Sequence, residues 1–256
     1  MLDPARLAPG HLSGVGLVVP VAPFGVGVPQ EPWEEFRELG DCAVVIDGAA
    51  SFEDAERDPA SYLGSIPVAM SFHATKPFAA GEGGCVACTD TQLARDAVRT
   101  LNFGFYDTRE SMSPSLNGKM SEYHAAVALA SLDVWESTRM TFLEVAAAYR
   151  EEFSRVGLGD CVITAPRIAS CYAILRAADT DQAARIRAQL GSRGIETRVW
   201  YGGGVHRHPH FARCAHGSLA VTEAIAGCLV GLPVAPDLAA DALRSVAETV
   251  AAEVRA

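Results

Sequence analysis

The pattern of apolar and polar residues predicts alternating strands and helices in the first part of the chain. Near-continuous apolar runs at 15–21, 42–46 and 66–72 predict buried strands, and the amphipathic stretch 32–39 predicts a short helix after the first of them. Apolar strands alternating with helices are typical of a parallel sheet that is covered on both faces. The later elements expected here are a strand at 84–88 and helices at 91–101, 121–136 and 139–157.

The second part of the chain combines further strands and helices after the glycines at 157–159. Strands are expected at 161–164, 170–176 and 195–201, and helices at 181–191, 217–228 and 237–255. The last helix carries an apolar stripe made of Leu243, Val246, Val250 and Val254. The pattern predicts an α/β protein with two domains, 1–138 with a mostly parallel sheet and 139–256 as a smaller α/β domain.

Charge and hydropathy exclude several classes of partner. The 256-residue chain has a formal net charge of −10 and no cluster of basic residues, which argues against nucleic acid because phosphate backbones select clustered lysine and arginine. Residues 1–6 lack the charged region and apolar core of a signal peptide. The apolar stretch 15–28 is interrupted by proline and glycine and is too short to span a bilayer. We therefore expect a cytoplasmic protein without a nucleic-acid or membrane partner.

The cysteines and histidines are the residues that could bind a metal ion. The seven cysteines are scattered and odd in number, which predicts reduced, mostly buried thiols. Cys85 and Cys88 form a C-x-x-C, but residues three apart on a strand face opposite sides and there is no second pair. The alternating histidines at 206–210 likewise lack the carboxylate or cysteine that would complete a ligand set. We expect no metal site.

One short segment carries the most specific chemistry. Ser71 and Lys76 follow a predicted strand, the glycine-rich step 81–84 comes shortly after, and Asp47 ends the preceding strand. This combination suits pyridoxal phosphate: the lysine would form the Schiff base, the acid would pair with the pyridinium nitrogen, and the serine would bind phosphate. The structural alternatives are a solvated loop lysine, an acid that caps a turn and a common strand-end serine.

At these residues the sequence resembles the DegT/DnrJ/EryC1/StrS family of sugar aminotransferases, which have fold type I of the pyridoxal-phosphate enzymes. Residues 71–76 and 81–84 match the family's Ser-Phe-His-x-x-Lys and Gly-Glu-Gly-Gly, and 47–50 is similar to its Asp-Ala-Ala-Gln. Family dehydratases carry histidine at the position of Lys76, so lysine favours transamination. Further motifs follow in family order: 102–104, 117–122, 125–126, 194–197, His206 and 232–233.

The resemblance implies a role for four residues. Lys76 is the implied catalytic lysine, Asp47 the partner of the ring nitrogen and Ser71 a phosphate ligand. Asn117 matches an asparagine that reaches the cofactor phosphate of the neighbouring subunit, which implies a homodimer or a complementing chain. Together these residues imply a partial fold type I transferase, in which 1–138 is a remnant of the cofactor-binding domain.

Other positions differ from the family or play a lesser part in it. Where the family has glutamine, this chain has Ala50, with Ser51 beside it. His206 is implied to face the substrate side of the cleft. His73 and His124 lie inside family motifs, and we expect them to serve packing or hydrogen bonding around the site.

Family members begin with a large segment that this chain is expected to lack. That segment carries a helix start that binds the phosphate and an aromatic ring that stacks on the pyridine. Helix N-termini are strong anion sites, so we expect weak cofactor binding and low activity of the chain alone. An incomplete sheet would also leave an unpaired edge.

The function that follows is transamination of a nucleotide-linked keto-deoxysugar. An amino acid, glutamate by family analogy, would supply the nitrogen, and Lys76 would move protons between the cofactor and the substrate carbon. The alternative is a non-catalytic remnant, or the C-terminal half of a split enzyme that acts through a partner chain.

Overall fold

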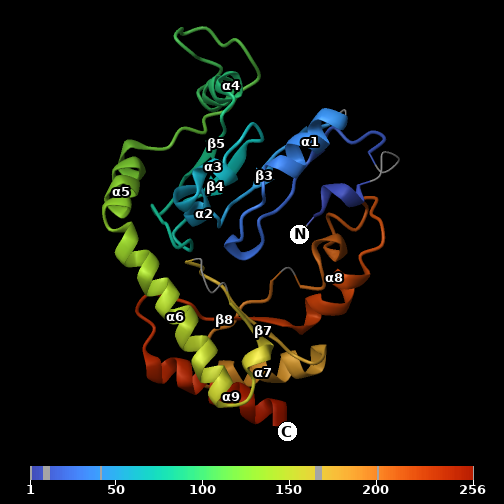
Figure 1. Ribbon diagram of the computed structural model, residues 1–256, viewed down its shortest axis with the longest axis vertical. Coiled ribbons are helices and arrows are strands. Elements are labelled where there is room, and N and C mark those ends of the chain that lie inside the picture. Colours follow the sequence, from blue (N-terminus) through green and yellow to red (C-terminus); the bar gives the residue numbers. More distant parts are fainter. Residues whose placement is uncertain (1, 8–11, 41, 165–168, 201, 256) are drawn as a thin grey trace. The chain divides into compact units, whose positions relative to one another are not determined.

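The computed structural model describes residues 2–7, 12–40, 42–164, 169–200 and 202–255 (Figure 1). The chain divides into two compact units, Met1–Arg139 and Met140–Ala256. The described residues form two small sheets in unit 1 and one in unit 2, and each unit has its own buried core.

Unit 1 contains the strands that position the candidate site. β1 (Leu17–Val18) pairs in parallel with β2 (Ala43–Val44). β3 (Ile46–Asp47) pairs in parallel with β4 (Val68–Ser71), which pairs in antiparallel with β5 (Gly84–Ala87). The predicted mostly parallel arrangement is therefore present in unit 1, and β5 runs against it because the chain turns back directly after β4.

Two short helices of unit 1 have no counterpart in the predicted pattern. They are too short for an apolar periodicity, but Pro59 begins the second of them and Asp58 accepts a hydrogen bond from Ser61 N. Ser121 caps a longer helix as its position suggests, since its Oγ accepts from His124 N at 3.2 Å. The helices of unit 1 are α1 (Glu31–Leu39), α2 (Phe52–Arg57), α3 (Pro59–Tyr62), α4 (Thr91–Leu101) and α5 (Glu122–Asp133).

Unit 2 is built on an antiparallel sheet with the strand order β6-β7-β8. Its strands are β6 (Val162–Thr164), β7 (Ala173–Arg176) and β8 (Leu229–Leu232). Its helices are α6 (Trp135–Arg155, which starts in unit 1), α7 (Thr180–Ser192), α8 (Ala220–Ile225) and α9 (Ala240–Arg255).

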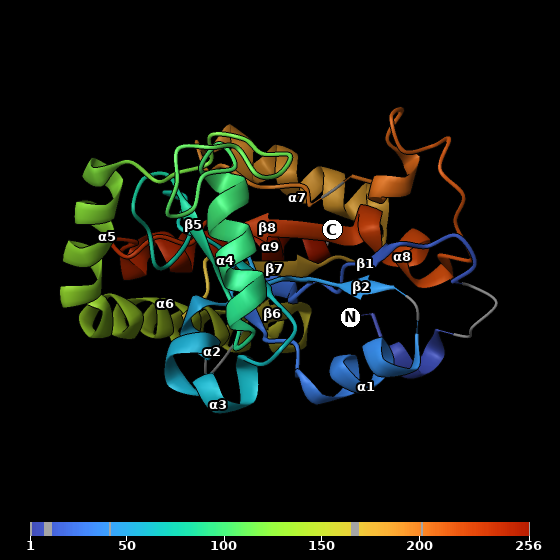
Figure 2. The ribbon, with the colours of Figure 1, turned by 90° about the horizontal axis from the view of Figure 1, so that it is seen from above.

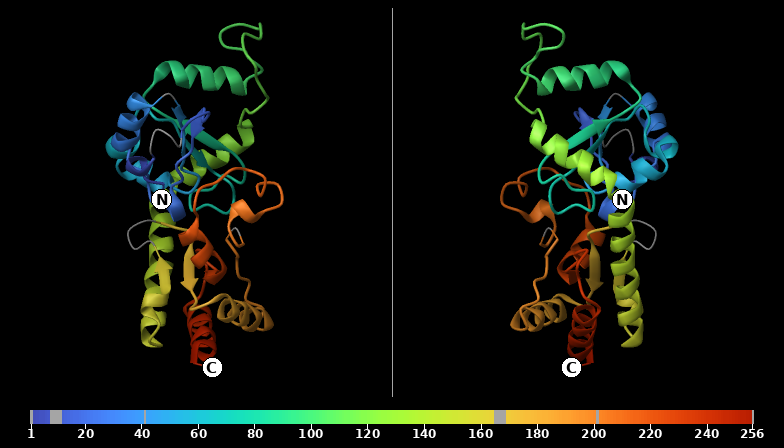
Figure 3. Two further views of the ribbon diagram at one scale, coloured as in Figure 1. Left: turned by 90° about the vertical axis from the view of Figure 1, so that its right-hand side faces the viewer. Right: turned by 90° about the vertical axis from the view of Figure 1, so that its left-hand side faces the viewer.

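One buried cluster joins the helices and strands of unit 2, whose ribbon is drawn in Figures 2 and 3. Tyr149 and Phe153 of α6 pack with Ile186 of α7 and Val230 of β8. The predicted stripe of α9 faces this cluster, with its first three residues buried and Val254 partly buried. Burial of this stripe explains why α9 forms as the sequence predicts.

The third strand of the unit 2 sheet is β8 and not the strand predicted at 195–201. The segment predicted as a strand at 195–201 contributes one antiparallel bridge, between Arg198 and Gly231, and residue 201 lies outside the described residues. The central strand β7 pairs instead with β8. The Leu-Val-Gly-Leu run of β8 is short and follows a helical segment, so periodicity gives it little signal.

The cysteines differ from the prediction of mostly buried thiols, which is wrong. All seven are free of disulfides, but only Cys42 is buried, and Cys85 and Cys214 are exposed. Cys85 is exposed on β5, which lies at the end of its sheet. Within the described residues, no helix is both long and apolar enough to cross a membrane.

Candidate functional site

One face of the β3–β4 pair presents the polar residues predicted from the sequence. Asp47 lies beside Ala69 in the parallel register, and Ser71 follows two residues after Ala69. Side chains alternate along a strand, so these residues share one face and are partly exposed. Ile46 and Val68, on the other face, are 0% exposed. The sheet thus buries one side and leaves Asp47 and Ser71 accessible on the other.

The backbone fixes Asp47 from two sides. Its N–H donates to Pro20 O at 2.9 Å and its carbonyl accepts from Ala22 N at 2.8 Å. The following residue, Gly48, donates to Ala69 O at 2.9 Å. The side-chain Oδ1 accepts from Ala49 N at 3.0 Å, and among the described residues no donor is bonded to Oδ2. The carboxylate is therefore oriented and keeps one oxygen for a ligand.

Lys76 lies in the connection between β4 and β5. Backbone hydrogen bonds continue the hairpin past the strands, from Phe72 N to Gly83 O and from Ala74 N to Gly81 O, both at 2.8 Å. Lys76 N donates to His73 O at 2.9 Å and closes a turn. The connection that carries the lysine is therefore a structured hairpin end.

Gly84 has a physical reason to be glycine. A Cβ at this position would lie 2.3 Å from Met70 O on the neighbouring strand. No real Cβ approaches a backbone oxygen so closely, so a side chain here would force β4 and β5 apart. The last glycine of the 81–84 motif is thus required for the pairing that begins at Ser71.

The Lys76 side chain is half-buried and has no hydrogen bond or ion pair among the described residues. It is one of only two lysines in the chain. The other, Lys119, is exposed and engaged, since its Nζ donates to Asn117 Oδ1 at 2.8 Å and lies 4.0 Å from the centroid of the Phe103 ring. Lys119 is therefore a natural control for any chemistry assigned to Lys76.

An aromatic cluster holds the Lys76 connection against the rest of unit 1. Phe78 is 4% exposed and stacks on Phe52 of α2 with ring centroids 3.9 Å apart. Its edge contacts with Phe72 and Trp135 have centroid distances of 5.1 and 5.7 Å. Ser131 Oγ of α5 also donates to Ala79 O at 2.7 Å. Lys76 therefore lies two residues before Phe78, which is buried in this aromatic cluster.

Ser71 contributes a hydroxyl at the carboxyl end of β4. Its Oγ accepts from His73 N at 3.3 Å, which leaves the hydroxyl proton as a donor. His73 is occupied locally, with Nδ1 2.9 Å from Thr75 Oγ1 and Nε2 3.7 Å from Glu82. The structure therefore brings Asp47, Ser71 and the Lys76 connection to one edge of the β3–β4–β5 sheet.

Asn117 lies in the connection between α4 and α5, drawn in green in Figure 1. It is exposed, forms an antiparallel bridge with Asn102 and accepts a hydrogen bond from Lys119. Its contacts belong to that connection, so the structure does not join it to the residues of β3 and β4. The predicted role of Asn117 toward a neighbouring subunit stays a prediction.

Ser51 and Tyr62 form a hydrogen-bonded pair, of which only Ser51 stands out in the sequence. Ser51 Oγ donates to Gly48 O at 2.8 Å and is hydrogen-bonded to the Tyr62 hydroxyl. Ser51, which stands beside the position of the family's glutamine, is fully buried, so its hydroxyl is committed to the turn after Asp47. Tyr62 has no motif signal, because its role depends on packing from α3.

In unit 2, His206 lies next to an acid. Its Nε2 is 3.5 Å from Glu223 Oε1, and Arg207 approaches the same oxygen at 3.2 Å. The hydrogen bond from Arg207, together with the nearby His206, holds the pKa of the Glu223 carboxyl below its usual value. Among the described residues, no group of three or more histidines, cysteines or acids is placed to hold a metal ion.

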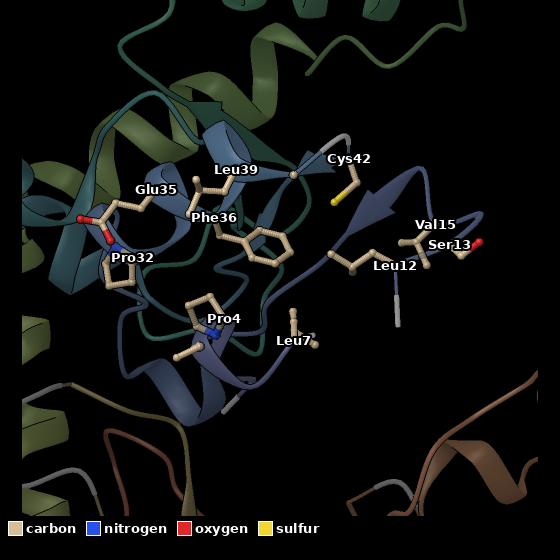
Figure 4. Close-up of a pocket in the computed structure, with 12 residues that line it drawn as sticks. Pro4, Leu7, Leu12, Ser13, Val15, Pro32, Glu35, Phe36, Leu39 and Cys42 are labelled. Carbon is tan, nitrogen blue, oxygen red and sulfur yellow. The ribbon is translucent and has the colours of Figure 1, made fainter. Parts of the chain in front are cut away.

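A cavity of about 550 Å³ lies elsewhere in unit 1 (Figure 4). Leu7, Leu12 and Phe36 line it with other mostly apolar residues. Ser13 and Cys42 place it at the amino ends of β1 and β2, whereas ligands of open α/β sheets bind at the carboxyl ends of strands. This cavity is therefore distinct from the edge that carries Asp47 and Ser71.

Comparison with known proteins identifies the family of the chain. The family model of the DegT/DnrJ/EryC1/StrS aminotransferase family matches residues 14–251. A Mycobacterium tuberculosis protein named Protein Rv3402c is 36% identical over 247 residues, which are 91% of this chain. The chain spans only 58% of that relative's length.

Two further similarities concern sugar chemistry. The dTDP-3-amino-3,4,6-trideoxy-alpha-D-glucose transaminase of Streptomyces venezuelae is 28% identical over 263 residues, covering 97% of this chain and 68% of the relative. The crystal structure of DesI in the presence of its TDP-sugar product superposes with a TM-score of 0.81 and 26% identity. That superposition covers 99% of this chain and 68% of the other.

Proposed function

This chain belongs to the DegT/DnrJ/EryC1/StrS aminotransferase family, and from that premise we propose that it is a pyridoxal 5′-phosphate-dependent transaminase of a nucleotide-linked keto-deoxysugar. An amino acid, glutamate, is the proposed donor. Glutamate would leave as 2-oxoglutarate, and the keto oxygen of the sugar would be replaced by an amino group.

The residues at the edge of the β3–β4–β5 sheet fit this cofactor. Asp47 Oδ2 has no bonded donor among the described residues, and the Lys76 amine is likewise without a partner there. The Ser71 hydroxyl keeps its proton for an acceptor such as a phosphate oxygen. The cofactor needs a carboxylate for its ring nitrogen, an amine for its aldehyde and a hydroxyl for its phosphate, and this part of unit 1 carries all three groups.

When bound, pyridoxal phosphate supplies an electron-withdrawing ring that stabilises negative charge on the carbon that loses a proton. Asp47 would hold a proton on the ring nitrogen, because an ionised carboxylate favours the charged ring. Lys76 Nζ would bind the cofactor aldehyde and then serve as the base and acid that moves the proton. Ser71 would orient the phosphate by donating its hydroxyl proton.

The sugar class is proposed from relatives rather than from the geometry. The Streptomyces venezuelae relative is named for a dTDP-linked amino sugar, and DesI was crystallised with its TDP-sugar product. Both names support a nucleotide-linked deoxysugar as the substrate of this chain.

The proposed enzyme works as an assembly, either a homodimer or a complex with a complementing chain. Support comes from α5, where Tyr123 and Leu129 are 75% and 66% exposed although the helix is largely apolar. An apolar helix with large exposed side chains is typical of an interaction site. Sedimentation of the wild-type protein beside Leu129→Asp tests the homodimer: wild-type protein that stays monomeric at every concentration would contradict it.

The observation that carries the function is the placement of Lys76, Asp47 and Ser71 at one sheet edge. The direct test supplies the protein with pyridoxal phosphate, glutamate and a dTDP-linked keto-deoxysugar, and detects amino sugar by mass spectrometry. We expect product from the wild type and none from Lys76→Arg, which keeps the charge but cannot replace the amine. Equal product from Lys119→Arg and from wild type is the matched control. Product from Lys76→Arg would contradict the assignment.

A further inference from the structure

The turn that follows Asp47 departs from the family's Asp-Ala-Ala-Gln step at two positions, Gly48 and Ala50. In the structure, both positions lie in one turn, which Ser51 closes by hydrogen bonds. The Gly48 carbonyl accepts from Ser51 N at 2.9 Å and from Ser51 Oγ at 2.8 Å. Because Ser51 Oγ donates to that carbonyl, the Tyr62 hydroxyl is the donor in the Ser51–Tyr62 hydrogen bond. A chain of two hydroxyls thus ends on the backbone directly after Asp47.

These hydroxyls occupy the space that an alanine side chain would need. A Cβ at position 48 would lie 2.6 Å from the Tyr62 hydroxyl oxygen and 2.7 Å from Ser51 Oγ. It would also lie 2.6 Å from Val68 Cγ1. Gly48 is therefore required by close approach, and the polar pair and the glycine form one unit of structure.

Contacts with Gln30 and Gly27 hold Tyr62 in place. Its backbone carbonyl accepts from Nε2 of the buried Gln30 at 3.0 Å. Its ring packs so closely on Gly27 that a Cβ there would lie 2.9 Å from two ring carbons. Tyr62 is only 4% exposed. A fixed ring can transmit its position through the hydroxyl to Ser51 and so to the turn.

We propose that Tyr62, acting through Ser51, positions the Asp47–Ala50 turn and thereby holds the Asp47 carboxylate in place for the cofactor's ring nitrogen. Tyr62 and Ser51 are positioning residues, because neither contacts the reacting atoms. The link to the ring nitrogen rests on the proposed function, whereas the control of the turn can be tested without any cofactor.

Electrostatics agree with this geometry. Burial, together with the charges of Asp54 and Asp47, raises the pKa of Tyr62 to about 12. The phenol is therefore neutral at physiological pH and remains a hydrogen-bond donor. A neutral donor in this position adds no second negative charge beside Asp47.

The test uses three variants and one matched control. Tyr62→Phe removes one hydroxyl, Ser51→Ala removes the other, and the double variant removes both. Tyr149→Phe is the control, because Tyr149 is a buried tyrosine whose hydroxyl donates to Pro233 O at 2.6 Å, and both residues belong to unit 2. A general loss of stability would appear in both tyrosine variants.

The first readout needs no cofactor. The Ala49 amide, which donates to Asp47 Oδ1, is followed by ¹H–¹⁵N NMR at one fixed pH. We expect a changed Ala49 amide chemical shift in Tyr62→Phe and Ser51→Ala, and no change in Tyr149→Phe. The double variant should change no more than the larger single, because the hydroxyls act in series. An unchanged Ala49 amide in Tyr62→Phe would overturn the proposal.

The second readout is the affinity for pyridoxal phosphate, measured by absorbance titration. Loss of one buried hydrogen bond predicts an increase in Kd of about fivefold for Tyr62→Phe. Wild-type affinity in Tyr62→Phe, with weakened binding in Asp47→Asn, would overturn the positioning role and leave the proposed function intact. No binding by the wild type would instead refute the proposed function, and the Ala49 readout would still decide whether Tyr62 controls the turn.

Discussion

Phe78 offers the most quantitative test of how the Lys76 connection is held. The residue is 4% exposed, so truncation to alanine removes almost the whole ring from a buried site. Substitutions of this kind cost about 3–5 kcal/mol. Phe78→Leu keeps most of the apolar volume and loses three ring contacts, with Phe52, Phe72 and Trp135. Since aromatic pairs add about 0.5–1.5 kcal/mol each, we expect a loss of about 2 kcal/mol for Phe78→Leu.

The assay follows unit 1 alone. The Ala80 amide donates to Phe72 O at 2.8 Å, so its hydrogen exchange reports the opening of the Lys76 connection. The free energy of opening is compared between wild type, Phe78→Leu and Phe78→Ala. Met112→Ala serves as the control, because this side chain of unit 1 is 65% exposed and its loss should change the value by less than about 0.5 kcal/mol.

The ranking of these variants decides the outcome. We expect Phe78→Ala to lose most, Phe78→Leu about half as much and Met112→Ala almost nothing. If Phe78→Ala lowered the opening free energy by no more than Met112→Ala does, the aromatic cluster would not hold the connection.

Two further predictions concern other parts of the chain. Tyr149→Phe should lower the free energy of unfolding of unit 2 by about 1–3 kcal/mol, because the Pro233 carbonyl loses its donor; urea denaturation checks this, and an unchanged midpoint would contradict it. Hydrogen bonds from Ser65 lower the pKa of the Glu34 carboxyl, so its contribution to stability is present above the carboxyl's ordinary pKa and is lost as the pH falls through the lowered native value. Glu34→Gln should remove that part of the acid sensitivity, and an unaltered stability-versus-pH curve would count against the Ser65 contacts.

Strong apolar patterns predicted most of the elements. The apolar stripe of α9 and the apolar runs of β3 and β4 can be read from the sequence. Their buried faces require apolar residues, and the spacing of those residues indicates the type of element. The strand predicted at 15–21 is shorter in the structure, where β1 covers only Leu17–Val18. Prolines at 20 and 23 lack the N–H that a longer ladder needs.

The candidate site was predictable only where single residues carry chemistry. Lys76, Asp47 and Ser71 stand in recognisable motifs, and their roles toward a cofactor stay predictions. The structure places Asp47 and Ser71 on one face of the β3–β4 pair and Lys76 in the connection that follows β4. Tyr62 was not predictable, because its hydroxyl reaches Ser51 from a four-residue helix that no periodicity indicates. Such contacts depend on how separate elements pack.

The central claim is that Lys76 is the residue that bonds to pyridoxal phosphate. The most direct measurement mixes the purified protein with pyridoxal phosphate, adds borohydride to fix the carbon–nitrogen bond, and maps the labelled peptide by mass spectrometry. With only two lysines in the chain, the outcome is unambiguous. The account predicts the label on Lys76 and none on Lys119, which its contacts with Asn117 and Phe103 occupy. Label on Lys119 without label on Lys76 would contradict it.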